Sequence, residues 1–532
     1  MSLIETHERF ASKTPFLGSD YMMKAISPET DQLNKRLGDA FYEAQLVADQ
    51  IQDVSGNQYL GSFANKGDQY QWLMDNAIAA SKTLNIAAGV SLSTEYLQQL
   101  TQPIVWPVNK DVTLADGSVQ NVTVPVVYLP ALSYDNLKDD GAIIVGNTLD
   151  LGSRGDINNL GGTIQGRQQL NLQSGGDINN VAGTLGGGNV SIDAAGNIQN
   201  LATTRKFNFS NAAGSIDQTV LTGQGTIQAT GNLIVNAGGD FIDQAGKLLA
   251  GGNASITAQG NLTQLDLELG NTLASANTNA SGNRTATSTL ITGGDANLSA
   301  EGALTSMGAT LQSGGKLSLK GATVDLQTTE SRQQSNTELD GGLIQYANSQ
   351  SSTDQTGVNA SAAAGISIEA TEGDVNIVGG DLQSASNIAI KAKGDVNLIE
   401  ARDSDQSESR VEEEGGLFSG DSASSQSSDK NLADVSNLTA GGGINIEAGG
   451  DVLSQGTQID ANIGTNIDAE GNVTLTSAKD YISTRSSEES SSWGSLISEE
   501  SSSTSDSTQH TATVINSQTL AISRQTVSLE GT

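Results

Sequence analysis

The sequence predicts a mainly β protein, a right-handed parallel β-helix with β-hairpin excursions, preceded by a small α+β module. Only 36% of the 532 residues are hydrophobic and 4% are aromatic, whereas 61 are glycine, which is too little apolar material for one conventional core. A triplet of Gly, then Asp or Asn, then an aliphatic residue recurs about every 20 residues in the second part of the chain. All six prolines and most aromatic residues lie before residue 140.

This change in composition near residue 140 divides the chain. Residues 1–19 are expected to be irregular, and residues 20–140 are expected to form a small helical or α+β module. Residues 141–532, in which Gly, Asn, Ser and Thr predominate, are expected to form the β-helix. A solenoid needs less apolar material than a globule, because each coil buries only a thin strip against its neighbours.

Three helices are predicted in residues 20–140. Apolar residues recur at helical spacing over residues 33–51, and a glycine follows as a stop. Asp68 is expected to cap a second helix over residues 68–84, and a serine is expected to cap a short third helix over residues 93–100.

A β-hairpin is predicted after these helices. Asp116-Gly117 supplies a tight turn between two strands, residues 112–114 and 119–129. Pro125 cannot donate a ladder hydrogen bond, so the second strand is expected to be an edge strand or to contain a bulge.

The periodic part of the chain is expected to form coils of about 20 residues. Aliphatic side chains at alternate positions would point inward, glycine would permit positive φ at the corners, and Asn or Asp would bind corner amides. About 260 residues in coils would give roughly 13 coils and a rod on the order of 60 Å. The triplets begin at Gly155, Gly176, Gly196, Gly239, Gly260, Gly373, Gly394, Gly450 and Gly471.

Polar excursions interrupt the coils at about residues 265–288, 328–364, 402–440 and 484–512. We interpret them as β-hairpins that leave the rod, although disordered loops fit the composition equally well. The last three excursions have small apolar centres that could pair with one another or with a second fibre, or pack onto their own rod, which is the arrangement we favour. The candidate interaction residues are Leu343, Ile344, Leu417, Phe418, Trp493 and Leu496.

Short stretches within residues 35–128, followed by residues 141–144 and 155–159, carry the motifs of a known family. These stretches resemble the filamentous-haemagglutinin-like exoproteins, which include the large stick proteins of contact-dependent growth inhibition. The resemblance covers nearly the whole chain from about residue 20, and its specific part is the segment before residue 140. It departs from the family pattern at Ala40, where glycine is expected, and at Ala48, where a basic residue is usual. The matching stretches are residues 35–39, 41–43, 46–47, 49–51, 104–106, 114–117, 124–125, 127–128, 141–144 and 155–159.

This resemblance implies a central fragment of a protein secreted to the bacterial cell surface. The expected function is a structural and adhesive stalk segment that presents a receptor-binding or toxin-delivery module. The expected partners are an outer-membrane two-partner transporter during export and a receptor or glycan on a target cell. Residues 20–140 would then either contact the target cell or shield the first open coil from edge pairing.

Charge and composition exclude several other classes of protein. The chain has 26 Lys and Arg against 60 Asp and Glu, a formal charge of −34 that repels phosphate backbones, so nucleic acid is not an expected partner. No stretch of 18 apolar residues suggests a transmembrane segment. The first ten residues do not read as a secretory signal, so the chain is expected to begin inside a longer precursor. The absence of cysteine suits export through an oxidising compartment.

The chain is expected not to be an enzyme and to carry no cofactor. Its only histidines, His7 and His510, lie in polar segments, which makes a Ser-His-Asp arrangement improbable. The alternative is a polysaccharide-degrading β-helix, which would need clustered acids with basic or aromatic sugar contacts. The repeat region offers few of the latter residues.

Two motifs in the coils have both a functional and a structural interpretation. The recurrent corner aspartates could bind calcium in a ladder, but they lack dense Gly-Gly-x-Gly-x-Asp spacing, so a role in the turns is favoured and no metal site is predicted. Arg154-Gly155-Asp156 is the tripeptide that integrins recognise, yet its Gly and Asp are also corner residues of the repeat. The corner aspartates are Asp156, Asp177, Asp240, Asp374, Asp395 and Asp451.

Overall fold

The computed structural model divides the chain into two compact units. One unit consists of residues 1–138 and 207–215, and the other of residues 139–206 and 216–532. The residues that the structure describes are 18–26, 40–55, 63, 65–84, 102–113, 119–128, 142–211, 214–415, 420–492 and 497–531. None of the described helices is long and apolar enough to span a membrane.

The first unit is the expected α+β module. It has three described helices, α2 (Ser19–Ile26), α3 (Ala40–Ser55) and α4 (Lys66–Leu84). Strands β1 (Ile104–Thr113) and β2 (Val119–Tyr128) pair antiparallel. Strand β1 begins well before the predicted residue 112, and the two prolines opposite each other, Pro107 and Pro125, are accommodated because both strands of a two-stranded sheet are edges. The predicted helix over residues 93–100 and the Asp-Gly turn lie outside the described residues.

A buried carboxylate joins the three helices of this module. The Glu43 side chain on α3 is fully buried and accepts hydrogen bonds from the Ser19 backbone amide at 2.8 Å and the Ser19 hydroxyl at 2.6 Å. The Tyr70 hydroxyl on α4 donates to the same carboxylate at 3.2 Å. The N-cap of α4 is Asn65 rather than the predicted Asp68, because Asn65 Oδ1 accepts the Asp68 amide at 3.0 Å. The Asp68 carboxylate in turn accepts a hydrogen bond from the Asn65 side-chain amide at 2.7 Å.

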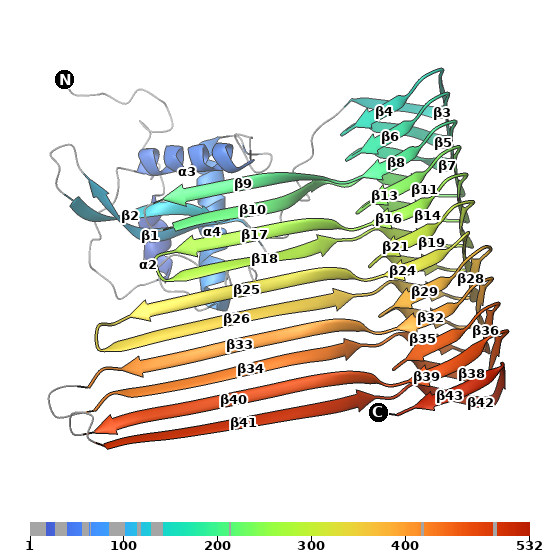
Figure 1. The fold of residues 1–532 in the computed structure, drawn as a ribbon. Helices are drawn as coiled ribbons and strands as arrows, with labels where there is room; N and C mark the ends of the chain where they lie inside the picture. Colours follow the sequence, from blue (N-terminus) through green and yellow to red (C-terminus); the bar gives the residue numbers. More distant parts are fainter. Residues whose placement is uncertain are drawn as a thin grey trace. The chain divides into compact units, whose positions relative to one another are not determined.

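The second unit is a parallel β-helix, as predicted, whose coils each pass through three faces (Figure 1). The third face is a sheet of twelve parallel strands, one for each coil, against the roughly 13 coils predicted. At about 4.8 Å per coil the stack is on the order of 50 Å tall. The strands of the third face are β4 (Ile157–Leu160), β6 (Ile178–Val181), β8 (Ile198–Leu201), β13 (Phe241–Gln244), β16 (Leu262–Leu265), β21 (Leu304–Met307), β24 (Val324–Gln327), β29 (Val375–Val378), β32 (Val396–Ile399), β37 (Val452–Gln455), β39 (Asn472–Thr476) and β43 (Thr526–Glu530).

The first and second faces are joined by strands that bend from one face into the other. These are β3 (Ile143–Ser153), β5 (Thr163–Ser174), β7 (Thr184–Ala194), β38 (Gln458–Ala469) and β42 (Val514–Ser523). The other first-face strands are β11 (Thr226–Ala229), β14 (Lys247–Ala250), β19 (Thr289–Thr292), β22 (Thr310–Ser313), β27 (Asn359–Ala362), β30 (Asp381–Ser384) and β35 (Asn437–Ala440). The other second-face strands are β12 (Leu233–Ala237), β15 (Ala254–Ala258), β20 (Ala296–Ala300), β23 (Lys316–Gly321), β28 (Gly365–Ala370), β31 (Ile388–Ala392) and β36 (Ile444–Ala448).

The core of the coils is built from columns of aliphatic side chains. Along the second face, Val235, Ile256 and Leu298 occupy equivalent register positions on successive coils, and all three are fully buried. The alternating pattern of buried and partly exposed residues in each short strand produces these columns, because successive side chains point to opposite faces of a sheet.

Five β-hairpins leave the coils and form one antiparallel sheet of ten strands (Figure 1). The sequence predicted four of these hairpins and missed the first. The hairpins are β9–β10 (Thr203–Asn211 and Gly214–Gly223), β17–β18 (Leu267–Ser275 and Thr278–Ala286), β25–β26 (Thr329–Asp340 and Ile344–Thr356), β33–β34 (Ala401–Glu413 and Ser422–Asp434) and β40–β41 (Ala478–Ser492 and Ile497–Thr511).

From the third coil onward, each hairpin follows the third-face strand of every second coil. In the coils without a hairpin, the chain turns directly into the next first-face strand through one residue with positive φ. These residues are Gly161, Ala182, Ala245, Gly308, Gly379 and Gly456. One left-handed residue therefore makes the direct corner, and a hairpin replaces it at alternate corners.

Candidate interaction surface

The candidate interaction surface is the ten-stranded hairpin sheet, whose strands from β17 onward lie wholly in the coil unit. Its strands β25, β26, β33, β34, β40 and β41 pair antiparallel over long stretches, so neighbouring hairpins are joined by main-chain ladders. For example, Tyr346 on β26 lies opposite Val411 on β33. The excursions thus pair with one another through their main chains.

The tip of the β25–β26 hairpin holds two of the predicted interaction residues. Leu343 and Ile344 are 63% and 51% exposed, so neither side chain packs onto the coils as the sequence favoured. The turn is set by Gly342, which has φ +82° and donates its amide to Asp340 Oδ1 at 2.9 Å. The Glu414 amide donates to the Leu343 carbonyl at 2.8 Å, which ties this tip to the next hairpin. The other predicted residues, Leu417, Phe418, Trp493 and Leu496, lie outside the described residues.

A short apolar row lies beside this tip, and sequence reasoning missed it. Leu339 is opposite Tyr346 across β25 and β26, and Tyr346 is opposite Val411 across β26 and β33. Directly opposed residues of antiparallel strands share a face, so the three side chains form a row that runs across three strands. Leu339 and Val411 are exposed. Only the register between hairpins could have revealed this row.

Carboxylates hold the bases of the hairpins where the ladders end. The ladder between β26 and β33 ends at Thr353 and Ser404, and just beyond it Asp403 Oδ1 accepts the Gln355 amide at 2.6 Å. Asp480 Oδ1 accepts the Ala433 amide at 2.7 Å in the equivalent place on the next hairpin. These aspartates satisfy amides that the diverging strands leave without a ladder partner.

Two carboxylates close to these bases, Asp434 and Glu400, are partly or almost fully buried. Burial, followed by the charges of Asp403 and Asp381, raises the pKa of Asp434 to about 6. Glu400 is almost buried and pairs with Arg402 at 2.7 Å, while Gln455 donates to the same carboxylate oxygen at 2.7 Å. The base of the β33–β34 hairpin is therefore a polar network rather than an apolar contact.

The corner aspartates act in the turns. Asp156 Oδ1 accepts the Asp177 amide at 2.9 Å, and Asp177 Oδ1 accepts the Asn197 amide at 2.7 Å. The same bond links Asp374 to the Asp395 amide at 2.8 Å. Within the part of the chain that the structure describes, no group of three or more His, Asp or Glu side chains could hold a metal ion. Asp156 of the Arg154-Gly155-Asp156 tripeptide is one of these corner residues.

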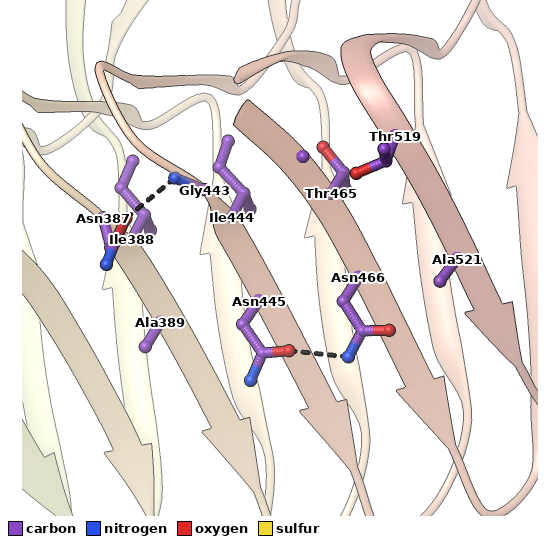
Figure 2. A pocket seen from close by; sticks show the side chains of 11 residues that line it. Asn387, Ile388, Ala389, Gly443, Ile444, Asn445, Thr465, Asn466, Thr519 and Ala521 are labelled. Atoms are coloured by element: carbon purple, nitrogen blue, oxygen red, sulfur yellow. Dashed lines mark hydrogen bonds between the residues drawn. The ribbon is translucent and has the colours of Figure 1, made fainter. Parts of the chain in front are cut away.

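The outside of the described coils has open hollows, among them a smaller and a larger one. One, of about 360 Å³, is lined by strands β31, β36, β38 and β42, and Figure 2 shows its amide ladder, in which Asn466 Nδ2 donates to Asn445 Oδ1 at 2.7 Å. The Gly443 amide donates to Asn387 Oδ1 at 2.8 Å at its upper end (Figure 2). The other, of about 630 Å³, follows the corner between the first and second faces, and Asp460 is the one carboxylate among its lining residues. Neither lining includes an arginine or an aromatic residue.

Of the two histidines, only His510 lies in the described part of the chain. His7 lies outside the described residues. His510 Nδ1 lies 3.4 Å from the Ser477 hydroxyl at the base of the last hairpin, and it belongs to neither lining.

Comparison with known proteins places the coils and hairpins in two related repeat families. A family described as haemagglutinin repeat matches residues 136–202, 208–266 and 263–331. A second, described as hemagglutinin repeat, matches residues 339–420 and 417–532. No solved structure matches the chain.

Curated relatives share the name CdiA. The tRNA nuclease CdiA-2 of Burkholderia pseudomallei is 29% identical over 412 residues, which is 71% of this chain and 13% of that protein. The toxin CdiA of Yersinia pestis is 27% identical over 281 residues, 48% of this chain and 8% of that protein. The deoxyribonuclease CdiA of Dickeya dadantii is 28% identical over 332 residues, 56% of this chain and 10% of that protein. The chain therefore spans only a small part of the length of these relatives. With haemagglutinin repeats along the whole β-helix, it belongs to the filamentous-haemagglutinin-like exoproteins, the family that includes the proteins of contact-dependent growth inhibition.

Proposed function

We propose that the chain is a structural and adhesive stalk segment of a large protein secreted to the bacterial cell surface. The observation that carries this proposal is the alternation of two coils with one hairpin, because it holds a continuous lateral sheet beside a stiff stack. The haemagglutinin repeats and the CdiA relatives support it. The segment would present a receptor-binding or toxin-delivery module of the whole protein, and the family implies export through an outer-membrane two-partner transporter.

We propose that catalysis is not a function of this segment. Glycoside cleavage needs two carboxylates a few ångströms apart on either side of the bond that breaks. The larger hollow on the coils has one carboxylate in its lining, Asp460, and the smaller has none. Two of the relatives are named as nucleases, but the region that matches this chain is only 13% and 10% of their length. The acidic charge of −34 disfavours nucleic acid as a partner.

Leu343 and Ile344 are the residues through which the hairpin sheet would contact a receptor or glycan on a target cell. Both are exposed at a tip whose backbone is fixed by hydrogen bonds, so contact would order few additional groups.

The test is the double substitution of Leu343→Ser and Ile344→Ser in the full-length secreted protein, displayed on cells and assayed for adhesion to target cells. We expect at least a tenfold loss of adhesion, since burial of two such side chains contributes about 3 kcal/mol or more. The matched control is Ile234→Ser, an exposed apolar residue on the second face of the coils, which should leave adhesion unchanged. If the unsubstituted protein, the double variant and the control adhere equally at equal surface display, Leu343 and Ile344 do not contact the target cell.

A further inference from the structure

A column of buried asparagines runs through the third face of the first coils. Asn159, Asn180 and Asn200 are buried at equivalent positions on β4, β6 and β8. Asn159 Nδ2 donates to Asn180 Oδ1 at 2.7 Å, and Asn180 Nδ2 donates to Asn200 Oδ1 at 2.8 Å. Each Nδ2 also donates to a corner carbonyl at 2.9–3.0 Å, and these carbonyls belong to Gly162, Gly183 and Gly225. Asn180 and Asn200 thus each use the side-chain amide both as donor and as acceptor.

Asp243 occupies the next position of this column, on β13. Its side chain is fully buried, and its Oδ1 accepts from Asn200 Nδ2 at 2.7 Å. Its Oδ2 has no hydrogen-bond partner within the described structure. An asparagine would place a donor at one of these two atoms, whereas an ionised carboxylate offers only acceptors. A buried carboxylate with one hydrogen bond and no cation beside it is costly by several kcal/mol.

The groups that face Asp243 are all neutral. Asn200 approaches from β8, and Gln264 lies at the equivalent position on β16. The Ser288 hydroxyl, just before β19, donates to the backbone carbonyl of Asp243 at 2.8 Å. Gln264 Nε2 also has no partner within the described structure. Burial is the largest cause that raises the pKa of Asp243, to about 7, and it outweighs the polar neighbours Asn200, Ser288 and Gln264, which lower it.

We propose that Asp243 is held in the folded stack as a neutral acid, so that the contact of β13 with its neighbours on the third face is a joint that binds one proton. The proton on Oδ2 supplies the hydrogen-bond donor that an asparagine would supply at this position. The column of polar side chains then continues past the first hairpin. When Asp243 ionises, the joint keeps its backbone ladder but contains an unpaired buried charge.

The direction of the pH effect follows from the two states of the joint. In the opened joint the carboxyl has an ordinary pKa near 3.9, whereas in the closed joint burial raises the pKa of Asp243 to about 7. Below about pH 4 both states are protonated, and opening is independent of pH. Between about pH 4 and 7 only the opened state loses its proton, so the opened population grows by up to about tenfold per pH unit. Above about pH 7 both states are ionised and the effect levels off.

Hydrogen exchange of the Phe241 and Ala245 amides in the whole chain tests the joint. These amides donate to the Asn261 and Leu265 carbonyls, both at 2.9 Å, and hold β13 on β16. After correction for intrinsic rates, we expect protection in the unsubstituted chain to fall by up to about 100-fold between pH 5 and 7. Asp243→Asn should keep its protection constant over this range. The matched control is Asp240→Asn, since Asp240 is a half-buried corner acceptor and asparagine retains its acceptor oxygen.

Two outcomes would overturn the proposal. One is the same pH dependence of protection in the unsubstituted chain and in Asp243→Asn. The other comes from infrared spectroscopy, which detects the carbonyl band of a protonated carboxyl group even if a variant folds poorly. At pH 6 the unsubstituted chain should show this band and Asp243→Asn should lack it. An identical spectrum for both chains at pH 6 would mean that Asp243 is ionised in the fold.

Discussion

Asp480 Oδ1 accepts the backbone amide proton of Ala433 at 2.7 Å, across the base of two neighbouring hairpins. The ladder between β34 and β40 ends at Asn431 and Tyr481, so this bond continues the pairing where the strands diverge. Asp403 makes the same contact with Gln355 one hairpin earlier. The two contacts show that each of the last two hairpins is fastened to the previous one by a side chain at the place where the main chain no longer pairs.

Asp480→Ala should therefore loosen the last hairpin. The Ala433 amide would lose a charge-assisted hydrogen bond, which contributes about 1.5–3 kcal/mol. Hydrogen exchange at Ala433 should quicken accordingly, while exchange within the coils should stay the same. Asp480→Asn is the control, because its side-chain oxygen still accepts the amide proton. Unchanged exchange at Ala433 in the alanine variant would contradict this role.

Among the described residues, Ala182 and Ala245 are the two non-glycine residues that turn a coil with positive φ, at 52° and 49°. An L residue in the left-handed region costs about 1–2 kcal/mol, part of which glycine gives back as conformational entropy. Ala182→Gly should stabilise the chain by up to about 1 kcal/mol, measured by urea unfolding. Ala202→Gly is the matched control, because Ala202 holds the corresponding corner before a hairpin and does not have positive φ, so this change should destabilise. A loss of stability in Ala182→Gly would contradict the strain.

The period of the coils could be predicted from the sequence because glycine, Asp or Asn, and an aliphatic residue perform the same task at every corner. The first hairpin could not be found in this way. The triplets that begin at Gly196 and Gly239 enclose β9 and β10, whose combined length is close to that of one coil, so the hairpin looks like a coil without its triplet. The corner residue does not reveal it either, because Ala202 precedes the first hairpin whereas Ala182 and Ala245 form direct corners.

The candidate surface was predicted only in part. Exposed Leu343 and Ile344 are visible in the sequence as apolar residues in a polar excursion. The row of Leu339, Tyr346 and Val411 depends on the register between two hairpins that are separated by two coils, and local sequence does not encode that register. The buried Asp243 was missed for a similar reason, since burial depends on which coil lies above and which below.

The two-coil spacing of the hairpins has a geometric cause that can be tested. A hairpin is two strands wide, and strands in a ladder and coils in a stack have the same separation of about 4.8 Å. Two coils therefore rise as far as one hairpin is wide, which lets successive hairpins pair in one sheet. Deletion of residues 359–436, which removes two coils with one hairpin, should leave a cooperatively folded chain. Deletion of residues 359–380, which removes one coil, should disrupt the hairpin sheet. Circular dichroism and thermal unfolding would compare the two, and equal stability would contradict the geometric match.

Thr465 places a hydroxyl in an aliphatic column of the second face. It is buried, lies between Ile444 and Leu520 in register, and its Oγ1 has no hydrogen-bond partner within the described structure. Thr465→Val removes an unsatisfied polar group without changing the shape, so it should stabilise the chain by about 1–3 kcal/mol in urea unfolding. Thr457→Val is the control, because the buried Thr457 hydroxyl donates to the Leu398 carbonyl at 3.4 Å. That variant should lose stability, and a similar change in both would contradict the distinction.

Asp434 should make stability depend on pH at the base of the β33–β34 hairpin. Burial, Asp403 and Asp381 raise its pKa to about 6, above the value of about 3.9 in the unfolded chain. Between these values the unfolded chain releases a proton that the folded chain retains, so the free energy of unfolding falls as pH rises from about 4 to 6. Asp434→Asn should therefore stabilise the chain at pH 7.5, by about 1 kcal/mol once solvent screening of this partly exposed group is allowed for. At pH 4 the substitution should have little effect. Asp429→Asn, on the same strand, serves as the control in thermal unfolding at both pH values, and an equal gain from both substitutions at pH 7.5 would show that the effect comes from net charge rather than from the position of Asp434.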